Sequence, residues 1–216
     1  MVRKGEYLER AVVIPGADVP IEGLYHHGKR RPGLLVVPPH PERGGSMEGP
    51  IVAEVAYAAT RAGHPTLRFN YRGVGASGGA FDAGEVDATA DVAAEHLAAC
   101  CDPDDPHVAL AVVGLGFGAA VAGRLARTRP HVSHLFLVSP EPDALDGLEA
   151  FKGTLVVAVG GQDPMDRAPW RALVDRVPDG RMTVIFGADQ AFRRGLVQLG
   201  RVVAETLHPP GELELV

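Results

Sequence analysis

Near-continuous apolar runs recur along this chain, each bounded by glycine, proline or polar residues. Runs without strict alternation are typical of strands buried on both faces of a parallel sheet. They fall at residues 33–37, 64–69, 108–113, 133–139, 155–159 and 182–186. Two further runs, 9–14 and 21–26, are separated by turn residues and predict a leading antiparallel hairpin.

Amphipathic stretches fill the intervals between these strands. Their apolar spacing and terminal signals predict helices over residues 48–63, 85–101, 117–129 and 170–177. A last helix is expected to carry Phe192, Leu196, Leu199 and Val203 on one stripe. Strands that alternate with helices predict an α/β fold, with a doubly wound, mostly parallel sheet and helices on both faces. The segment 140–152 is too short for an inserted lid domain, so we expect an open pocket.

The centre of the pattern is a buried strand that runs into a glycine turn and a helix start. Its glycines stand at Gly114, Gly116 and Gly118. The spacing matches the nucleophile elbow G-x-S-x-G, in which a serine sits on a strained strand-to-helix turn. Here the middle position is Gly116, and glycine takes a positive backbone torsion without the steric cost of a β-carbon. The sequence therefore predicts an elbow that lacks its nucleophile.

Two other interpretations compete for this glycine turn. The spacing Gly114-x-Gly116-x-x-Ala119 also fits a dinucleotide-binding fingerprint, whose acidic partner would be Glu141, beyond Pro140. A membrane-helix contact motif is set aside, because the uncharged run is shorter than the roughly 20 residues that a span needs. Nucleotide binding by the segment 114–119 stays a minor alternative.

Composition narrows the class of protein. The chain has 216 residues, 46% of them hydrophobic, and can bury a substantial core as one domain over residues 1–216. Its net charge of −6 gives no electrostatic footprint for nucleic acid. The neighbouring Cys100 and Cys101 suit neither a disulfide nor a metal site. The first residues lack an apolar signal region, so we expect a cytoplasmic protein with no cofactor, no metal and no membrane association.

Two further segments carry a resemblance to a known family. A strand opens into Pro39-His40-Pro41, followed by Gly44-Gly45-Ser46-Met47, and a later segment, 69–78, reads Phe-Asn-Tyr-Arg-Gly-Val-Gly-Ala-Ser-Gly. With the glycine elbow, these motifs resemble the small, lidless bacterial α/β-hydrolases related to dienelactone hydrolase. The resemblance runs from about Gly33 to the last helix and implies the α/β-hydrolase fold.

The resemblance assigns three catalytic positions, in the chain order serine, acid, histidine. The serine falls on Gly116, the acid on Asp163 and the histidine on Gln190. Serine acyl transfer needs a nucleophilic oxygen and an imidazole that takes and returns its proton. Glycine supplies no nucleophile and a carboxamide does not titrate near neutral pH, so the inherited mechanism cannot run.

A cleft at the carboxyl ends of the strands is nevertheless expected to persist, since open α/β sheets bind ligands there. Its expected lining residues are His40, Glu42, Gly44, Gly45, Ser46, Phe117, Asp163 and Gln190. The resemblance implies that the loop after His40 supplies an oxyanion-hole amide, and Phe117 adds an amide at a helix N-terminus. We therefore expect a non-catalytic hydrolase homologue that binds a small polar ligand or a protein partner, and a homodimer is compatible with this interpretation.

The main alternative is an active enzyme with a relocated nucleophile. Ser46 lies near the expected oxyanion loop, His40 is in the same loop, and Asp163 would complete the set. Such an arrangement would perform esterase, thioesterase or lyase chemistry. Geometry decides between the two interpretations, because a general base must lie within hydrogen-bond reach of the proton that it takes.

Overall fold

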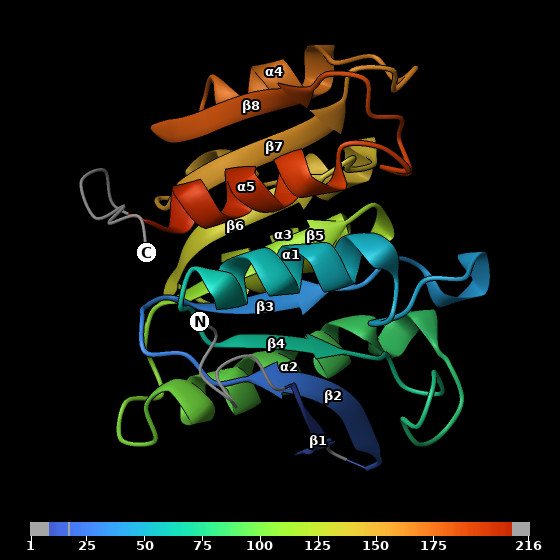
Figure 1. Ribbon diagram of the computed structural model, residues 1–216, viewed down its shortest axis with the longest axis vertical. Helices are drawn as coiled ribbons and strands as arrows, with labels where there is room; N and C mark the ends of the chain where they lie inside the picture. The colour runs from blue at the N-terminus through green and yellow to red at the C-terminus, as the bar shows by residue number, and fades with distance from the viewer. Residues whose placement is uncertain (1–8, 17, 209–216) are drawn as a thin grey trace, which may run out of the picture.

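The computed structural model describes residues 9–16 and 18–208, which form one eight-stranded sheet in the order β1-β2-β4-β3-β5-β6-β7-β8 (Figure 1). The strands are β1 (Arg10–Pro15), β2 (Pro20–His26), β3 (Gly33–Val37), β4 (Thr66–Phe69), β5 (Leu110–Leu115), β6 (Val132–Val138), β7 (Thr154–Gly160) and β8 (Asp179–Ile185). β1 pairs antiparallel with β2, and β2 pairs antiparallel with β4. From β4 to β8 every pairing is parallel. The predicted hairpin and mostly parallel sheet are confirmed.

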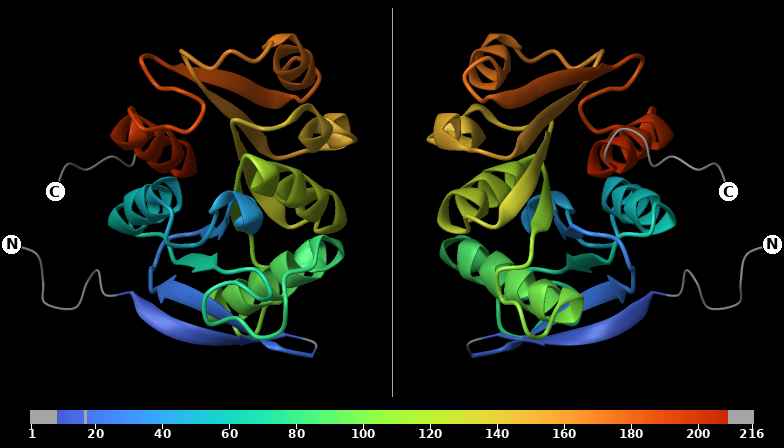
Figure 2. Two further views of the ribbon diagram at one scale, coloured as in Figure 1. Left: turned by 90° about the vertical axis from the view of Figure 1, so that its right-hand side faces the viewer. Right: turned by 90° about the vertical axis from the view of Figure 1, so that its left-hand side faces the viewer.

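In the described part of the chain, five α-helices cover the two faces of the sheet. They are α1 (Pro50–Arg61), α2 (Val86–Cys101), α3 (Phe117–Thr128), α4 (Ala168–Val174) and α5 (Leu196–Leu207). Helices α1 and α5 lie side by side on one face, and α2, α3 and α4 lie on the other (Figure 2). The central strands are therefore buried on both sides, which explains their near-continuous apolar sequences.

Four short 3₁₀-helices lie in the connections. They are η1 (Pro41–Arg43), η2 (Ala83–Glu85), η3 (Pro142–Leu145) and η4 (Leu148–Ala150). η1 belongs to the loop that follows β3, and its left-handed C-cap is Gly44. This loop projects from the end of the sheet where the parallel strands terminate (Figure 1). Across the described residues, no helix is both long and apolar enough to cross a membrane.

One predicted element needs correction. The last helix begins at Leu196, so Phe192 is not part of its apolar stripe. Phe192 has a φ of 49° and Gly195 has a φ of 86°, and both values are incompatible with a continuing right-handed helix. The Phe192 ring is still buried, because the turn directs it into the core beneath α5. Its apolar character is explained by this turn and not by helical periodicity.

Candidate functional site

The turn between β5 and α3 has the backbone geometry of a strained elbow. Gly116 has φ 56° and ψ −115°, a conformation that side chains other than glycine rarely adopt. A β-carbon built on this residue would have no heavy atom within 4 Å beyond its chain neighbours. Space for a side chain therefore remains where the sequence supplies none.

Gly114 and Gly118, which flank Gly116, are glycines for a different reason. A β-carbon at Gly114 would collide with the backbone of α3, at Gly118 and Ala119. A β-carbon at Gly118 would collide with the carbonyl groups of Val37 and Pro38, at the end of β3. These two positions are glycine because strand and helix pack closely, whereas Gly116 is free of such crowding.

A cleft of about 610 Å³ opens above this elbow. It brings together seven of the predicted site residues, namely His40, Gly44, Gly45, Ser46, Gly116, Phe117 and Gln190. Sequence reasoning missed most of the apolar and charged lining, which includes Arg43, Ile51, Val138, Ser139, Glu141, Phe192, Arg193 and Leu196. The cleft thus combines an apolar wall from α1, β6 and α5 with polar groups at the strand ends.

Two predicted site residues lie outside the lining of the cleft. Glu42 is exposed, and its backbone N–H donates to Nδ1 of His40 at 3.2 Å, so this amide is not directed at a ligand as expected. Asp163 is only 6% exposed and lies behind Ser139. Its Oδ1 accepts from the N–H of Met165 at 3.0 Å, and its Oδ2 accepts from Oγ of Ser139 at 3.3 Å.

The positions assigned to the acid and the histidine flank a common neighbour. Gln190 is exposed, and its Nε2 donates to the sulfur of Met165 at 3.4 Å. The N–H of Met165 in turn donates to Asp163. The loop before Gln190 is fixed to the end of β7, because the N–H of Gln162 donates to the carbonyl of Ala188 at 2.8 Å.

The hydrogen bonds of Ser46 and His40 lead away from a relocated triad. Oγ of Ser46 accepts from the N–H of Glu48 at 3.2 Å, a local turn contact. Nδ1 of His40 accepts a hydrogen bond from its own loop. The centroid of the His40 ring lies 4.5 Å from that of Phe117 and 5.5 Å from that of Phe81. Since the buried acid is bonded to Ser139, the hydrogen bonds of these side chains give the relocated arrangement no support.

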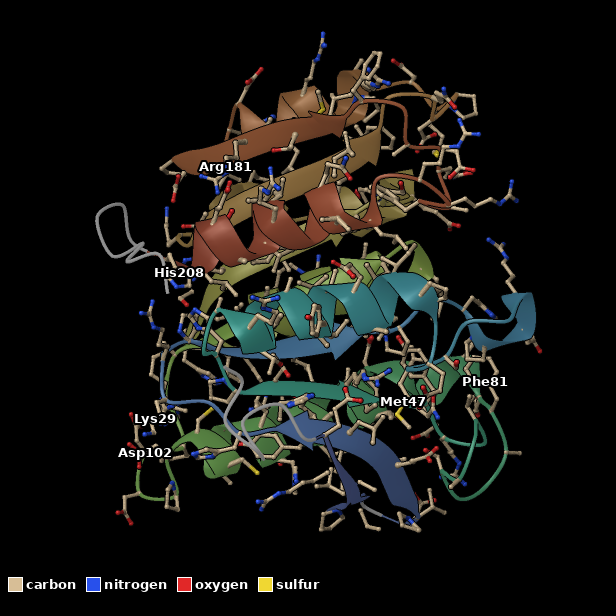
Figure 3. The ribbon with its side chains drawn as sticks, viewed as in Figure 1. Lys29, Met47, Phe81, Asp102, Arg181 and His208 are labelled. Atoms are coloured by element: carbon tan, nitrogen blue, oxygen red, sulfur yellow. The ribbon has the colours of Figure 1, made fainter. Side chains whose placement is uncertain are left out.

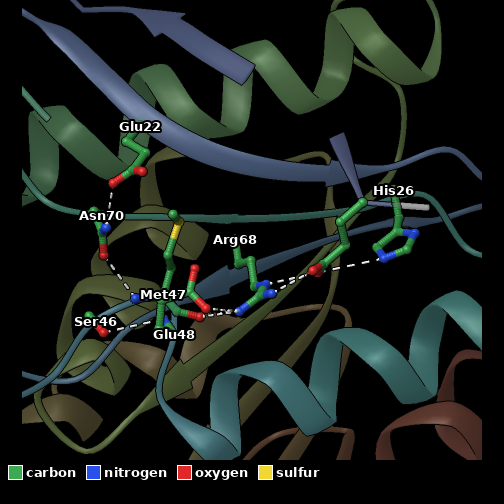
Figure 4. A network of polar contacts seen from close by, with 8 residues as sticks. Glu22, His26, Ser46, Met47, Glu48, Arg68 and Asn70 are labelled. Carbon is green, nitrogen blue, oxygen red and sulfur yellow. Dashed lines mark hydrogen bonds and ion pairs between the residues drawn. The ribbon is translucent and has the colours of Figure 1, made fainter. Parts of the chain in front are cut away.

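The loop that carries Ser46 is held through the buried residue Met47, whose backbone is bound by the side chains of Asn70 and Arg68. These two contacts form the Met47 clamp. The N–H of Met47 donates to Oδ1 of Asn70 at 2.9 Å, and its carbonyl accepts from Nη1 of Arg68 at 2.5 Å (Figure 4). Met47 and Phe81 lie at the end of the sheet that holds the cleft, and His208 lies at the opposite end (Figure 3). Both backbone polar groups of Met47 are thus fixed by side chains from β4 and the residue that follows it.

Carboxylates from the leading hairpin orient the two clamp residues. Glu9 accepts from Nε and Nη2 of Arg68 at 2.9 and 2.6 Å, a bidentate pair. Oε2 of Glu22 accepts from Nδ2 of Asn70 at 2.8 Å (Figure 4). Arg68 is only 6% exposed, so this pairing compensates the burial of its charge.

Backbone strain concentrates in the cleft. In the described part of the chain, Ser139 and Phe192 are the only non-glycine residues with positive φ, at 42° and 49°. Both line the cleft, as does Gly116. Strained residues persist only where the surrounding structure enforces them, and they cluster at ligand sites. Three such positions in one cavity identify it as the candidate functional site.

Neutral and paired groups lie beside this site and at its rim. The Tyr71 hydroxyl donates to the carbonyl of Pro38 at 3.2 Å, and burial raises the pKa of this phenol well above its usual range. At the rim, Arg43 pairs with Glu141 at 3.1 Å, and Arg193 lies 3.6 Å from Asp189. The two cations are exposed and paired, so they form no strong anion trap.

Sequence comparison finds a similar protein whose function is not assigned. No family model matches the chain. An uncharacterised protein of Rickettsia prowazekii is 34% identical over 130 residues, which are 58% of this chain and 52% of that protein. The match thus spans about half the length of this curated relative.

Structural comparison finds α/β hydrolases. A protein of unknown function from Agrobacterium tumefaciens, described as an α/β hydrolase, superposes with a TM-score of 0.78 at 27% identity, over 92% of this chain and 94% of that one. A serine hydrolase without a lid from Xanthomonas campestris gives a TM-score of 0.74 at 22% identity, over 91% and 92%. Dienelactone hydrolase from Anabaena variabilis gives 0.73 at 22% identity, over 92% and 95%. The predicted α/β-hydrolase fold and the likeness to small lidless members are confirmed.

Proposed function

We propose that this hydrolase-like chain binds a small ligand in the elbow cleft and does not perform serine–histidine hydrolysis. The observation that carries the proposal is Gly116, which has the torsions of an elbow and open space at its β-carbon position. Without an oxygen there, no acyl-enzyme can form at this turn. The function that the remaining groups support is recognition.

The cleft retains the features of a small-molecule site. Its volume of about 610 Å³ lies within the range of ligand pockets, roughly 300–1,000 Å³. Its apolar wall includes Ile51, Val138 and Leu196, and its polar groups are few. The N–H of Ala119, in the first turn of α3, donates to the carbonyl of Gly116 at 2.9 Å. The N–H groups of Phe117 and Gly118 have no intrahelical acceptor, and Gly116 provides no side-chain cap for them. They are donors for a ligand oxygen at the floor of the cleft.

Binding is tested by a thermal-shift screen of alcohols, carboxylic acids, esters and NAD(P), since a ligand of the native state raises Tm. Two adjacent positions on α5 offer a matched pair. Leu196 lines the cleft, whereas Val197 is 63% exposed and lies outside its lining. A tryptophan at the first position fills the cleft, and a tryptophan at the second leaves it open.

We expect compounds that raise the Tm of the wild type and of Val197→Trp but not that of Leu196→Trp. NMR of the same samples should show the ester probes unchanged. A screen whose hits stabilise all three proteins equally would place binding elsewhere. Turnover of an ester that Leu196→Trp abolishes would replace the proposal with an active hydrolase.

A further inference from the structure

Ser139 supplies a buried hydroxyl to the cleft. It follows the last residue of β6, is 6% exposed, and lines the cleft beside Val138. Its N–H donates to the carbonyl of Ala158 at 2.9 Å, which fixes the residue at the end of the sheet. Its φ of 42° is strained for a serine. The fold thus holds this hydroxyl in one place.

The partner of Ser139 determines what its oxygen can offer to a ligand. Oγ donates its single proton to Oδ2 of Asp163 at 3.3 Å. A hydroxyl has only one proton, and that of Ser139 is engaged by Asp163. The lone pairs of Ser139 Oγ therefore remain, and they can only accept a hydrogen bond.

The other side chains near this point also present acceptors. The amide nitrogen of Gln190 donates to the sulfur of Met165, so its carbonyl oxygen is the group left for a ligand. Glu141 also lines the cleft, where its carboxylate pairs with Arg43 at 3.1 Å. Backbone donors lie at the start of α3, next to the strand end that precedes Ser139.

We infer that the ligand of this cleft carries a hydroxyl or amino group, which donates a hydrogen bond to Oγ of Ser139. The inference rests on the proposed function, since it names the chemical class that the same cleft selects. A ligand whose oxygen is alkylated has no proton to donate, so it buries Oγ of Ser139 without a hydrogen bond. The missing hydrogen bond weakens binding. Asp163 acts as a positioning residue, because it sets the direction of the Ser139 proton.

A pair of probes that differ only in this donor tests the inference. 4-Fluorobenzyl alcohol has an O–H, and 4-fluorobenzyl methyl ether replaces that proton with a methyl group. Their affinities are measured by fluorine NMR with the wild type, Ser139→Ala, Asp163→Asn and Ser133→Ala. Ser133 lies near the start of β6, the strand that ends directly before Ser139, and its hydroxyl donates to the carbonyl of Leu110, so it serves as the matched control.

The alcohol should bind the wild type and Ser133→Ala about fivefold or more tightly than the ether, the scale of one hydrogen bond. In Ser139→Ala the two probes should bind equally. Asp163→Asn should reverse the preference, because its Oδ1 can keep the N–H of Met165 while its Nδ2 donates to Ser139. The Ser139 proton then points at the ligand, and an ether oxygen becomes the better partner.

A structural role alone would weaken both probes together and would not reverse their order. Equal affinity of the two probes for the wild type, or an unchanged preference in Ser139→Ala, would overturn the inference and leave the proposed ligand site standing. Absence of alcohol binding at millimolar concentration would also overturn it. The screen with the Leu196→Trp and Val197→Trp variants judges the proposed function separately.

Discussion

The N–H of Gly116 donates to the carbonyl of Val138 at 2.9 Å, so the tip of the elbow is joined to the end of β6 directly before Ser139. The strained Gly116 is thus held by Val138, the residue directly before the strained Ser139. A substitution that changes the backbone of Gly116 can therefore displace Val138 and Ser139, which line the cleft. Substitutions at Gly116 test both the stability of the fold and the geometry of the cleft.

Gly116→Ala should lower the free energy of unfolding by about 1–3 kcal/mol, the cost of a non-glycine residue in such a conformation. The loss comes from backbone strain alone, because the added methyl group meets no atom within 4 Å. Urea unfolding measures it. Gly84→Ala, at a glycine without positive φ, serves as the control and should change stability by about 0.5 kcal/mol or less. Equal stability of Gly116→Ala and the wild type would show that the turn is relaxed.

Gly116→Ser combined with Gln190→His should restore part of a catalytic triad. The new hydroxyl has open space. The histidine would replace Gln190, whose side chain contacts Met165, and Met165 in turn contacts Asp163. Recovery should be partial, since a triad must be held within about half an ångström. The readouts are ester turnover and labelling by a fluorophosphonate.

The single variants provide the control for this prediction. Serine without a base is a weak nucleophile, and histidine without serine activates nothing, so the two effects should be strongly non-additive. Labelling of the double variant should disappear when Asp163→Ala is added. A folded double variant that is neither labelled nor active would contradict the assignment of Gly116 and Gln190 to the triad positions.

Asn70→Ala should loosen the loop that carries Ser46. The substitution leaves the buried N–H of Met47 without its acceptor, at a cost of about 1–3 kcal/mol, and leaves Oε2 of Glu22 with the N–H of Ala76 as its donor. Hydrogen exchange should accelerate at residues 44–49 more than in the central strands. Arg124→Ala, which removes the exposed pair with Asp87, is the control and should cost less than about 1 kcal/mol. Uniform acceleration across the whole sheet would contradict a local clamp.

His64→Asn should reduce the loss of unfolding free energy that occurs as the pH falls. Burial is the main cause that lowers the pKa of His64, from 6.5 to about 4, and Nδ1 donates to the carbonyl of Pro32 at 2.9 Å. Between these two values the unfolded chain binds a proton that the folded chain does not, so stability falls as the pH falls from about 6.5 to about 4. Asparagine keeps a donor and does not titrate.

The wild type should lose about 2 kcal/mol more than His64→Asn between pH 7 and pH 4.5, as measured by urea unfolding at both pH values. His208, Arg30 and His134 act on His64 in the same direction as burial. Parallel pH dependence of the two proteins would show that His64 is not the residue responsible.

The sequence predicted the sheet and the elbow because both depend on local patterns. Residues 33–37 are apolar without interruption, and β3 has these bounds in the structure. The glycine spacing at 114–118 placed the turn correctly. Phe192 was assigned to the wrong element because its spacing from Leu196 fits a helix, whereas a positive φ at a non-glycine residue has no sequence signal.

The polar contacts of the site could not be predicted in the same way. Arg68 and Asn70 reach Met47 across more than twenty residues, and no periodicity encodes such contacts. Asp163 was expected to face the cleft, but its carboxylate points at Ser139, a residue that the elbow pattern passed over. One available signal was its position, since Ser139 directly follows a buried strand at the edge where ligands bind.

The central claim is that the elbow cleft works without a nucleophilic serine. The chain has four serines, Ser46, Ser77, Ser133 and Ser139, and the claim requires that none of them is activated. Intact-mass measurement after treatment of the wild type with a fluorophosphonate tests this most directly, with peptide mapping of any adduct. We expect no adduct under conditions that label an active serine hydrolase completely. A stoichiometric adduct on Ser46 or Ser139 would contradict the account and identify the protein as an active enzyme with a relocated nucleophile.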